Sequence, residues 1–151
     1  MSAATATSGT VAGTYLTFQV ANEEYGIEIL KVREIIGMLP ITPVPGSPAV
    51  MQGVVNLRGK VIPVLSMRNR FNLQPGEPHE HNVIIVVDAG DGGQIGLAVD
   101  RVREVANFTA ADTEPPPTYG MSIDASMVAA LGKSQNRIRI LLDLAKVLVS
   151  V

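Results

Sequence analysis

Residues 26–35 read Gly-Ile-Glu-Ile-Leu-Lys-Val-Arg-Glu-Ile, and residues 96–105 read Gly-Leu-Ala-Val-Asp-Arg-Val-Arg-Glu-Val. Matching positions lie 70 residues apart, from 26 to 96 and from 35 to 105. A second correspondence places Val61–Met67 opposite Ile138–Leu144, and in both an apolar strand runs into a capped helix. Self-similarity at a fixed offset indicates a repeated structural unit. We therefore predict two packed copies of one small barrel, with chance similarity between strand-rich segments as the alternative.

The rest of the chain supports a mostly β fold. Short β-branched runs are separated by Gly and Pro, a pattern that favours a barrel over a helical bundle. Helical segments are predicted only as a turn at 30–32 and two short helices, 67–71 and 144–148, capped by Ser66 and Asp143. The predicted strands lie in 15–20, 25–29, a short run ending at 36, 53–64 with a tight turn inside it, 83–87, 94–99 and 138–142.

Two local features sharpen this prediction. The connection Asp88–Gly93 supplies residues that tolerate positive φ, so 83–99 is the clearest hairpin of the chain. Pro63 has no N–H to donate to a ladder, so its strand is expected at a sheet edge or beside a bulge.

We expect one domain preceded by a tail. Residues 1–13 are mostly Ala, Thr, Ser and Gly and predict a flexible N-terminal segment. Residues 14–151 then form a single domain of two barrel subdomains with a boundary near 72–82. Strands can be exchanged between the two subdomains. Each copy alone is too small to bury much surface, so the interface between them should be part of the core. A seam between two barrels is also a natural place for a partner groove.

The composition argues against several classes of protein. Lys and Arg total 12 against 14 Asp and Glu, and there are three Tyr, three Phe and no Trp, which does not fit a nucleic-acid binder. The absence of Cys excludes a disulfide framework, a thiolate nucleophile and a Cys-ligated zinc site. The first ten residues lack the features of a signal peptide, and the apolar runs are too short to span a bilayer. We expect a cytosolic protein that does not insert into membranes.

The search for catalytic chemistry yields little. The sequence contains no nucleophile elbow, no Walker loop and no zinc-protease motif. His79 and His81 form a pair that a metal site would need to complete with a third ligand, and a plain loop is the favoured interpretation. Glu23 and Glu24 are adjacent and fit a solvated turn better than an acid–base pair. We predict no enzyme activity, no cofactor and no metal.

Arg58 is the residue of most functional interest. It lies in a tight turn of an apolar stretch, between Gly53 and Gly59. A solvated turn arginine is one interpretation, and an anchor for a protein partner is the other, since Arg is enriched at interface hot spots. Val32 and Glu34 also have two interpretations. They are either contacts with a partner or simply one buried and one exposed residue of a strand.

At this point the chain resembles the CheW-like domain family. The resemblance covers about residues 14–149 and rests on several motifs in family order: 24–36, 41–48, 53–64, 96–100 with 104–105, the prolines 115–117 and 138–144. It implies two intertwined five-stranded SH3-like barrels. It also implies a non-catalytic adaptor of bacterial chemotaxis that couples the cytoplasmic tip of a chemoreceptor to the regulatory domain of the histidine kinase CheA, and that reaches membrane receptor arrays through these partners.

The resemblance also assigns binding residues. The receptor-contact positions of the family match Val32, Glu34, Gly53 and Arg58, and the kinase-contact positions match Val83, Glu114 and Tyr119. One departure is Ser66-Met67-Arg68, where the family usually has Asp-Leu-Arg, although Ser keeps the helix cap. Two other functions stay open at this stage: an adaptor for a non-chemotactic sensory kinase, and a small-ligand-binding barrel or an enzyme using a pocket between the subdomains.

Overall fold

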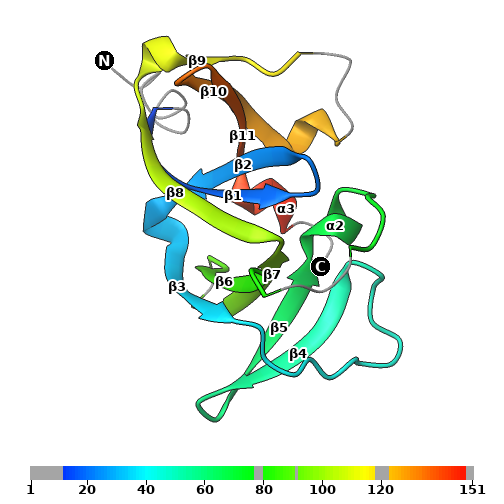
Figure 1. Cartoon of the computed structure of the whole chain (residues 1–151). Helices are drawn as coiled ribbons and strands as arrows, with labels where there is room; N and C mark the ends of the chain where they lie inside the picture. The colour runs from blue at the N-terminus through cyan, green and yellow to red at the C-terminus, as the bar shows by residue number, and fades with distance from the viewer. Residues whose placement is uncertain (1–11, 77–79, 91, 118–122, 149–151) are drawn as a thin grey trace.

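The computed structural model describes residues 12–76, 80–90, 92–117 and 123–148. It consists of two sheets and a few short helices (Figure 1). The tail predicted for residues 1–13 lies outside the described residues except for its last two, and Gly13 already opens the first strand. The mostly β class and the duplicated two-barrel fold are confirmed.

One sheet, which we call the terminal barrel, is built from both ends of the chain in the strand order β8-β1-β2-β11-β10-β9. Its strands are β1 (Gly13–Val20), β2 (Glu23–Glu28), β8 (Arg101–Phe108), β9 (Thr113–Glu114), β10 (Val128–Ser134) and β11 (Arg137–Leu142). The other sheet, the central barrel, has the order β3-β6-β7-β5-β4. Its strands are β3 (Val32–Gly37), β4 (Met51–Leu57), β5 (Lys60–Ser66), β6 (Val83–Asp88) and β7 (Gln94–Val99).

The short helices occupy equivalent places in the two repeats. The chain contains α2 (Met67–Arg70) after β5 and α3 (Leu144–Val147) after β11, together with the 3-10 turns η1 (Ile29–Lys31), η2 (Ala110–Asp112) and η3 (Ala125–Met127). The predicted caps are confirmed, because Ser66 accepts from the Asn69 N–H and Asp143 accepts from the Lys146 N–H.

The repeats exchange hairpins. The first repeat gives β1 and β2 to the terminal barrel, and the second gives β6 and β7 to the central barrel. The central barrel is therefore one continuous piece of chain, 32–99, inserted between the two parts of the terminal barrel (Figure 1). The expected boundary near 72–82 falls between the two repeats and not between the two sheets, because β6 and β7 pair with strands of the first repeat.

Each barrel is closed by one bent strand that supplies both edges. In the terminal barrel, β9 follows β8 after the η2 turn and pairs with β10. In the central barrel, Thr42 lies beyond the end of β3 and forms a bridge with Val54 of β4. If β8 and β9 are counted as one bent strand, the terminal barrel has the five strands that the family resemblance implies.

The largest apolar cluster lies between the barrels. In β6, Ile84 and Val86 belong to the interior of the central barrel, whereas Ile85 and Val87 belong to the shared cluster. Successive side chains of a strand point to opposite faces, so β6 is buried on both. The shared cluster joins outward-facing residues of the two barrels and includes Leu16, Ile27 and Leu142 from the terminal barrel and Leu65, Ile85 and Leu97 from the central barrel.

Pro63 is not on an edge strand, since β5 lies between β4 and β7. The pairing of β5 with β7 begins only at Val64, and β4 has a register shift between Met51 and Gly53, next to Val54, the residue that pairs with Pro63. The bulge alternative therefore accounts for the proline.

The closure of the central barrel requires a residue without a side chain at Gly53, and this requirement can be tested. Its φ is +153°, and an added Cβ would meet the Thr42 carbonyl oxygen and approach Ile41 Cγ2 to 2.7 Å. We expect Gly53→Ala to lower the free energy of unfolding by about 2 kcal/mol, because the backbone is strained for a side chain and the bridging segment has to shift. Urea unfolding measures this change. Gly37→Ala in β3 is the control, since nothing lies within 4 Å of a Cβ there. Equal stability of the two variants would contradict this role for Gly53.

Candidate partner-binding surfaces

The structure brings Glu34 and Arg58 together. Arg58 Nη2 lies 2.6 Å from Glu34 Oε2, and the side chains are 68% and 33% exposed for Arg58 and Glu34 respectively. Glu34 comes from β3 and Arg58 from the β4–β5 turn, so this ion pair joins the two edges of the sheet where the central barrel closes. The local turn geometry supports this placement, since Arg58 adopts a φ of +52° and Asn56 Oδ1 accepts the Gly59 N–H.

The other two predicted receptor-binding residues are placed differently. Val32 begins β3, is half-buried and packs against the shared cluster. Gly53 is buried and presents no side chain, so its role is to let β4 approach Thr42. Two of the four predicted residues therefore form an exposed charged pair, and the other two shape the barrel around it.

The residues predicted to bind the kinase do not form one site. Val83 begins β6 in the central barrel, where it pairs with Gly37 and Val99. Glu114 is exposed on β9 of the terminal barrel and forms a 2.5 Å ion pair with Lys133 of β10. Tyr119 lies outside the described residues.

A cleft of about 470 Å³ opens near the point where the chain crosses between the barrels. Arg68 and Asp100 stand in it as an ion pair of 2.6 Å, and this hydrogen bond raises the pKa of the Arg68 guanidinium. Asp100 Oδ2 also accepts the Ala21 N–H of the β1–β2 turn at 2.8 Å. The carboxylate therefore ties α2 of the central barrel to a hairpin of the terminal barrel. Met38 and Gln52, the latter adjacent to Gly53, line the same cleft.

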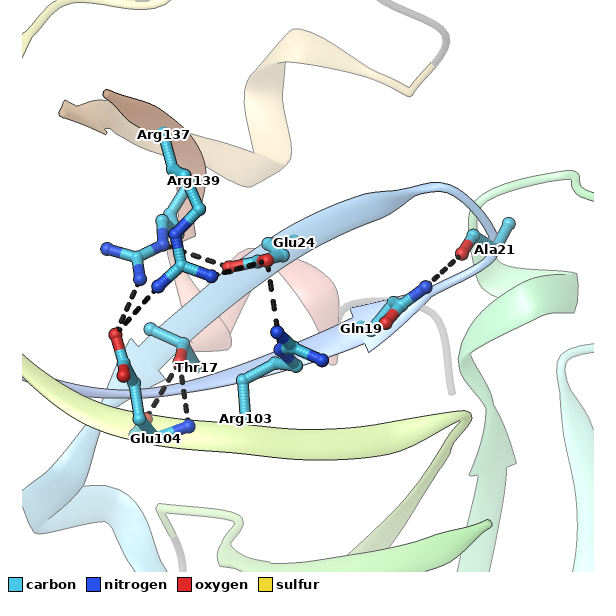
Figure 2. A network of polar contacts seen from close by, with 8 residues as sticks. All are labelled: Thr17, Gln19, Ala21, Glu24, Arg103, Glu104, Arg137 and Arg139. Atoms are coloured by element: carbon cyan, nitrogen blue, oxygen red, sulfur yellow. Dashed lines mark hydrogen bonds and ion pairs between the residues drawn. The ribbon is translucent and has the colours of Figure 1, made fainter. Parts of the chain in front are cut away.

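Sequence reasoning missed a cluster of charges inside the terminal barrel (Figure 2). Arg139 is 0% exposed; its Nε lies 2.9 Å from Glu24 and its Nη2 lies 2.6 Å from Glu104. Arg137 contacts the same two carboxylates at 3.2 and 3.1 Å, and Arg103 lies 3.8 Å from Glu24. The cluster links β2, β8 and β11, whose positions in the chain are far apart.

The repeat contains the signal that would have found this cluster. Aligning Val61 with Ile138 places Arg139 opposite Ile62, which is buried in the interior of the central barrel. A charge at a position that its copy fills with isoleucine has to be paired to be tolerated. Arg139 Nη1 is nevertheless buried without a hydrogen-bond partner, and the guanidinium lies 5.9 Å from the centre of the Phe108 ring.

Other expectations concern metals and membranes. The described residues contain no group of three or more His, Cys, Asp or Glu side chains that could hold a metal ion. His79 lies outside the described residues, and His81 lies 3.9 Å from Glu80. Within the described ranges no helix is long and apolar enough to cross a membrane.

Comparison with known proteins agrees with this geometry. The chain matches the CheW-like domain family over residues 14–151 and belongs to that family. It is 37% identical to a chemotaxis protein CheW of Klebsiella aerogenes over 93% of this chain and 84% of that protein. It is 33% identical to the chemotaxis protein CheW of Rhizobium meliloti over 89% and 86% of the two chains.

A solved structure shares the fold. The scaffolding protein TtCheW of Thermoanaerobacter tengcongensis superposes with a TM-score of 0.83 at 32% identity, covering 91% of this chain and 93% of that one. At that coverage the similarity extends over both barrels.

The buried cluster yields a prediction about stability. Arg139→Ala should lower the free energy of unfolding by roughly 3 kcal/mol, because it leaves the largely buried carboxylate of Glu24 with fewer partners and creates a cavity. Arg139→Ile, which copies Ile62 of the other repeat, should lose less because it fills the space. Adding Glu24→Gln, which copies Gln94, should recover most of the remaining loss by removing one carboxylate. Urea unfolding measures all three, and wild-type stability of Arg139→Ala would show that the cluster contributes nothing.

Proposed function

We propose that this chain is a non-catalytic scaffold that couples chemoreceptors to the histidine kinase CheA. The observation that carries the proposal is the match of both barrels to the CheW-like domain family over residues 14–151. A scaffold of this kind acts through geometry, because it binds two proteins at separate surfaces and couples their states energetically. On this proposal the chain works in the cytoplasm and reaches receptor arrays at the membrane through its partners.

The receptor surface is proposed at the closing seam of the central barrel. Glu34 and Arg58 form an exposed pair there, and such a pair contributes little to stability in solvent. A partner that covers the pair removes it from water and makes its hydrogen bonds stronger, which suits an arginine anchor. The nearby cleft with Met38 and Gln52 offers a groove for the helical hairpin of a receptor. Val32 and Gly53 support this surface from within.

The kinase surface is proposed around Val83, with Glu114 and Tyr119 as further contacts. Val83 lies in the central barrel and Glu114 in the terminal barrel, so these contacts belong to different barrels. Contacts on both barrels suit a protein that binds more than one partner domain at once.

Calorimetric titration into the CheW-like regulatory domain of CheA from the same organism tests the coupling function. Saturable one-to-one binding is the expected result, and added receptor tip should bind without displacing the kinase domain. Failure to bind the kinase domain at high concentration, by a chain shown to be folded, would leave the fold intact and remove the proposed kinase coupling.

The receptor surface is tested by Arg58→Ala. We expect receptor binding to weaken at least tenfold while the free energy of unfolding changes by less than about 0.5 kcal/mol, because the side chain is exposed. The control is Arg33→Ala, which removes an ion pair of 2.9 Å with Asp88 on the same barrel and should leave receptor affinity unchanged. If Arg58→Ala unfolds the protein or binds receptor like the wild type, the role of Arg58 as an anchor is wrong.

A further inference from the structure

A second pocket, also of about 470 Å³, lies beside Val83. It is bounded on one side by the start of β8 and on the other by the residues that lead into β6. Its lining consists of Glu80, His81, Val83, Arg101, Val102, Arg103 and Glu104. Of its two arginines, Arg103 lies at the margin of the charged cluster, and Arg101 belongs neither to that cluster nor to the predicted binding residues.

The first of these arginines is unusual within the molecule. Arg101 is the one arginine in the described part of the chain whose guanidinium makes no ion pair and no hydrogen bond. It is half-buried, so solvent does not fully compensate for the missing partner. Arg103 is barely better placed, since its contact with Glu24 is 3.8 Å long.

The acidic groups at the pocket are mostly committed elsewhere. Glu104 holds Arg139 at 2.6 Å and Arg137 at 3.1 Å, and Glu24 behind it holds Arg139 at 2.9 Å. Glu80 points to solvent, with its side chain 87% exposed and 3.9 Å from His81. Asp100, which lines a neighbouring pocket with Arg101, is held by Arg68 at 2.6 Å. Arg101 and Arg103 are therefore left as cationic side chains of the pocket whose nearby carboxylates are engaged by other arginines or point to solvent.

We propose that this pocket is a cationic socket that accepts an acidic side chain of the kinase regulatory domain. The proposal rests on the kinase surface proposed around Val83, which lines the same pocket. A carboxylate matches the planar fork of a guanidinium and forms a bidentate, charge-assisted contact. Arg101 has both sets of donors available for it. Entry of the carboxylate also gives Arg103 a closer partner than Glu24.

Comparison of the two repeats shows that, among the described residues, a half-buried guanidinium without a partner is particular to the second repeat. Lys31 and Arg33 hold the same positions in the first repeat, 70 residues before Arg101 and Arg103 (31 to 101, 33 to 103). Arg33 is already neutralised by Asp88 at 2.9 Å, and Lys31 is exposed. The two repeats thus provide a site and its matched control on one scaffold.

The test is calorimetric titration of the full chain into the kinase regulatory domain at several salt concentrations. Arg101→Glu should weaken binding at least tenfold, and Arg101→Gln should weaken it less and flatten the salt dependence. Lys31→Glu, the matched control, should change affinity less than twofold. Urea unfolding of each variant shows that the fold is retained.

The outcomes separate this inference from the proposed function. If the wild type binds and Arg101→Glu binds equally well, the socket is wrong and the kinase coupling stands. If the wild type does not bind, both are wrong. Inorganic phosphate is titrated in parallel: saturable phosphate binding that depends on Arg101 and competes with the kinase domain would identify a small-anion site and overturn the assignment to an acidic side chain.

Discussion

The packing of the two barrels' outward faces against each other is the constraint on which the rest of the molecule depends. Strands such as β6 bury both faces, one in their own barrel and one in the shared cluster. Because the hairpins are exchanged, neither barrel can form from one repeat alone. The chain crosses from one barrel to the other at η1 and at Asp100, so the exchange fixes the position of these two connections. The cleft and the second pocket lie beside Asp100.

The two barrels use the same acidic position in opposite ways. Glu34 in the central barrel meets an arginine that is 68% exposed, whereas its counterpart Glu104 meets Arg139, which is 0% exposed. The interior of the central barrel is apolar around Ile62, so its charged pair stays at the surface and remains available to a partner. In the terminal barrel Glu104 is itself 43% exposed, but its contacts with Arg137 and the buried Arg139 link β8 to β11, and Glu24 adds β2. The same position thus belongs to an exposed ion pair in one repeat and contacts a buried arginine in the other.

Features set by neighbouring residues could be predicted from the sequence. The hairpin 83–99, the caps Ser66 and Asp143 and the repeat itself depend on local turn chemistry and periodicity, and all are present. The sequence leaves room for an exchange of hairpins without requiring it, because the exchange depends on pairings such as that of β2 with β11, whose contacts span more than 100 residues. Arg139 is flanked by apolar residues and therefore fits an ordinary strand. No residue near it in the sequence indicates that Glu24 is its partner. The family resemblance groups Glu34 with Arg58, and only the closed barrel shows that they touch.

A scaffold that transmits a signal between partners needs surfaces whose relative position does not drift. Asp100 contributes to this rigidity, because it accepts from Arg68 of the central barrel and from the Ala21 N–H of the terminal barrel. Arg101 follows Asp100 directly, so the proposed socket lies next to a residue that forms a polar link between the barrels. A partner seated at Val83 and Arg101 would therefore act on the same junction that borders the cleft with Met38 and Gln52. That junction combines the Asp100 carboxylate and its donors with the apolar cluster shared by the two barrels, so the two surfaces are held on one rigid connection.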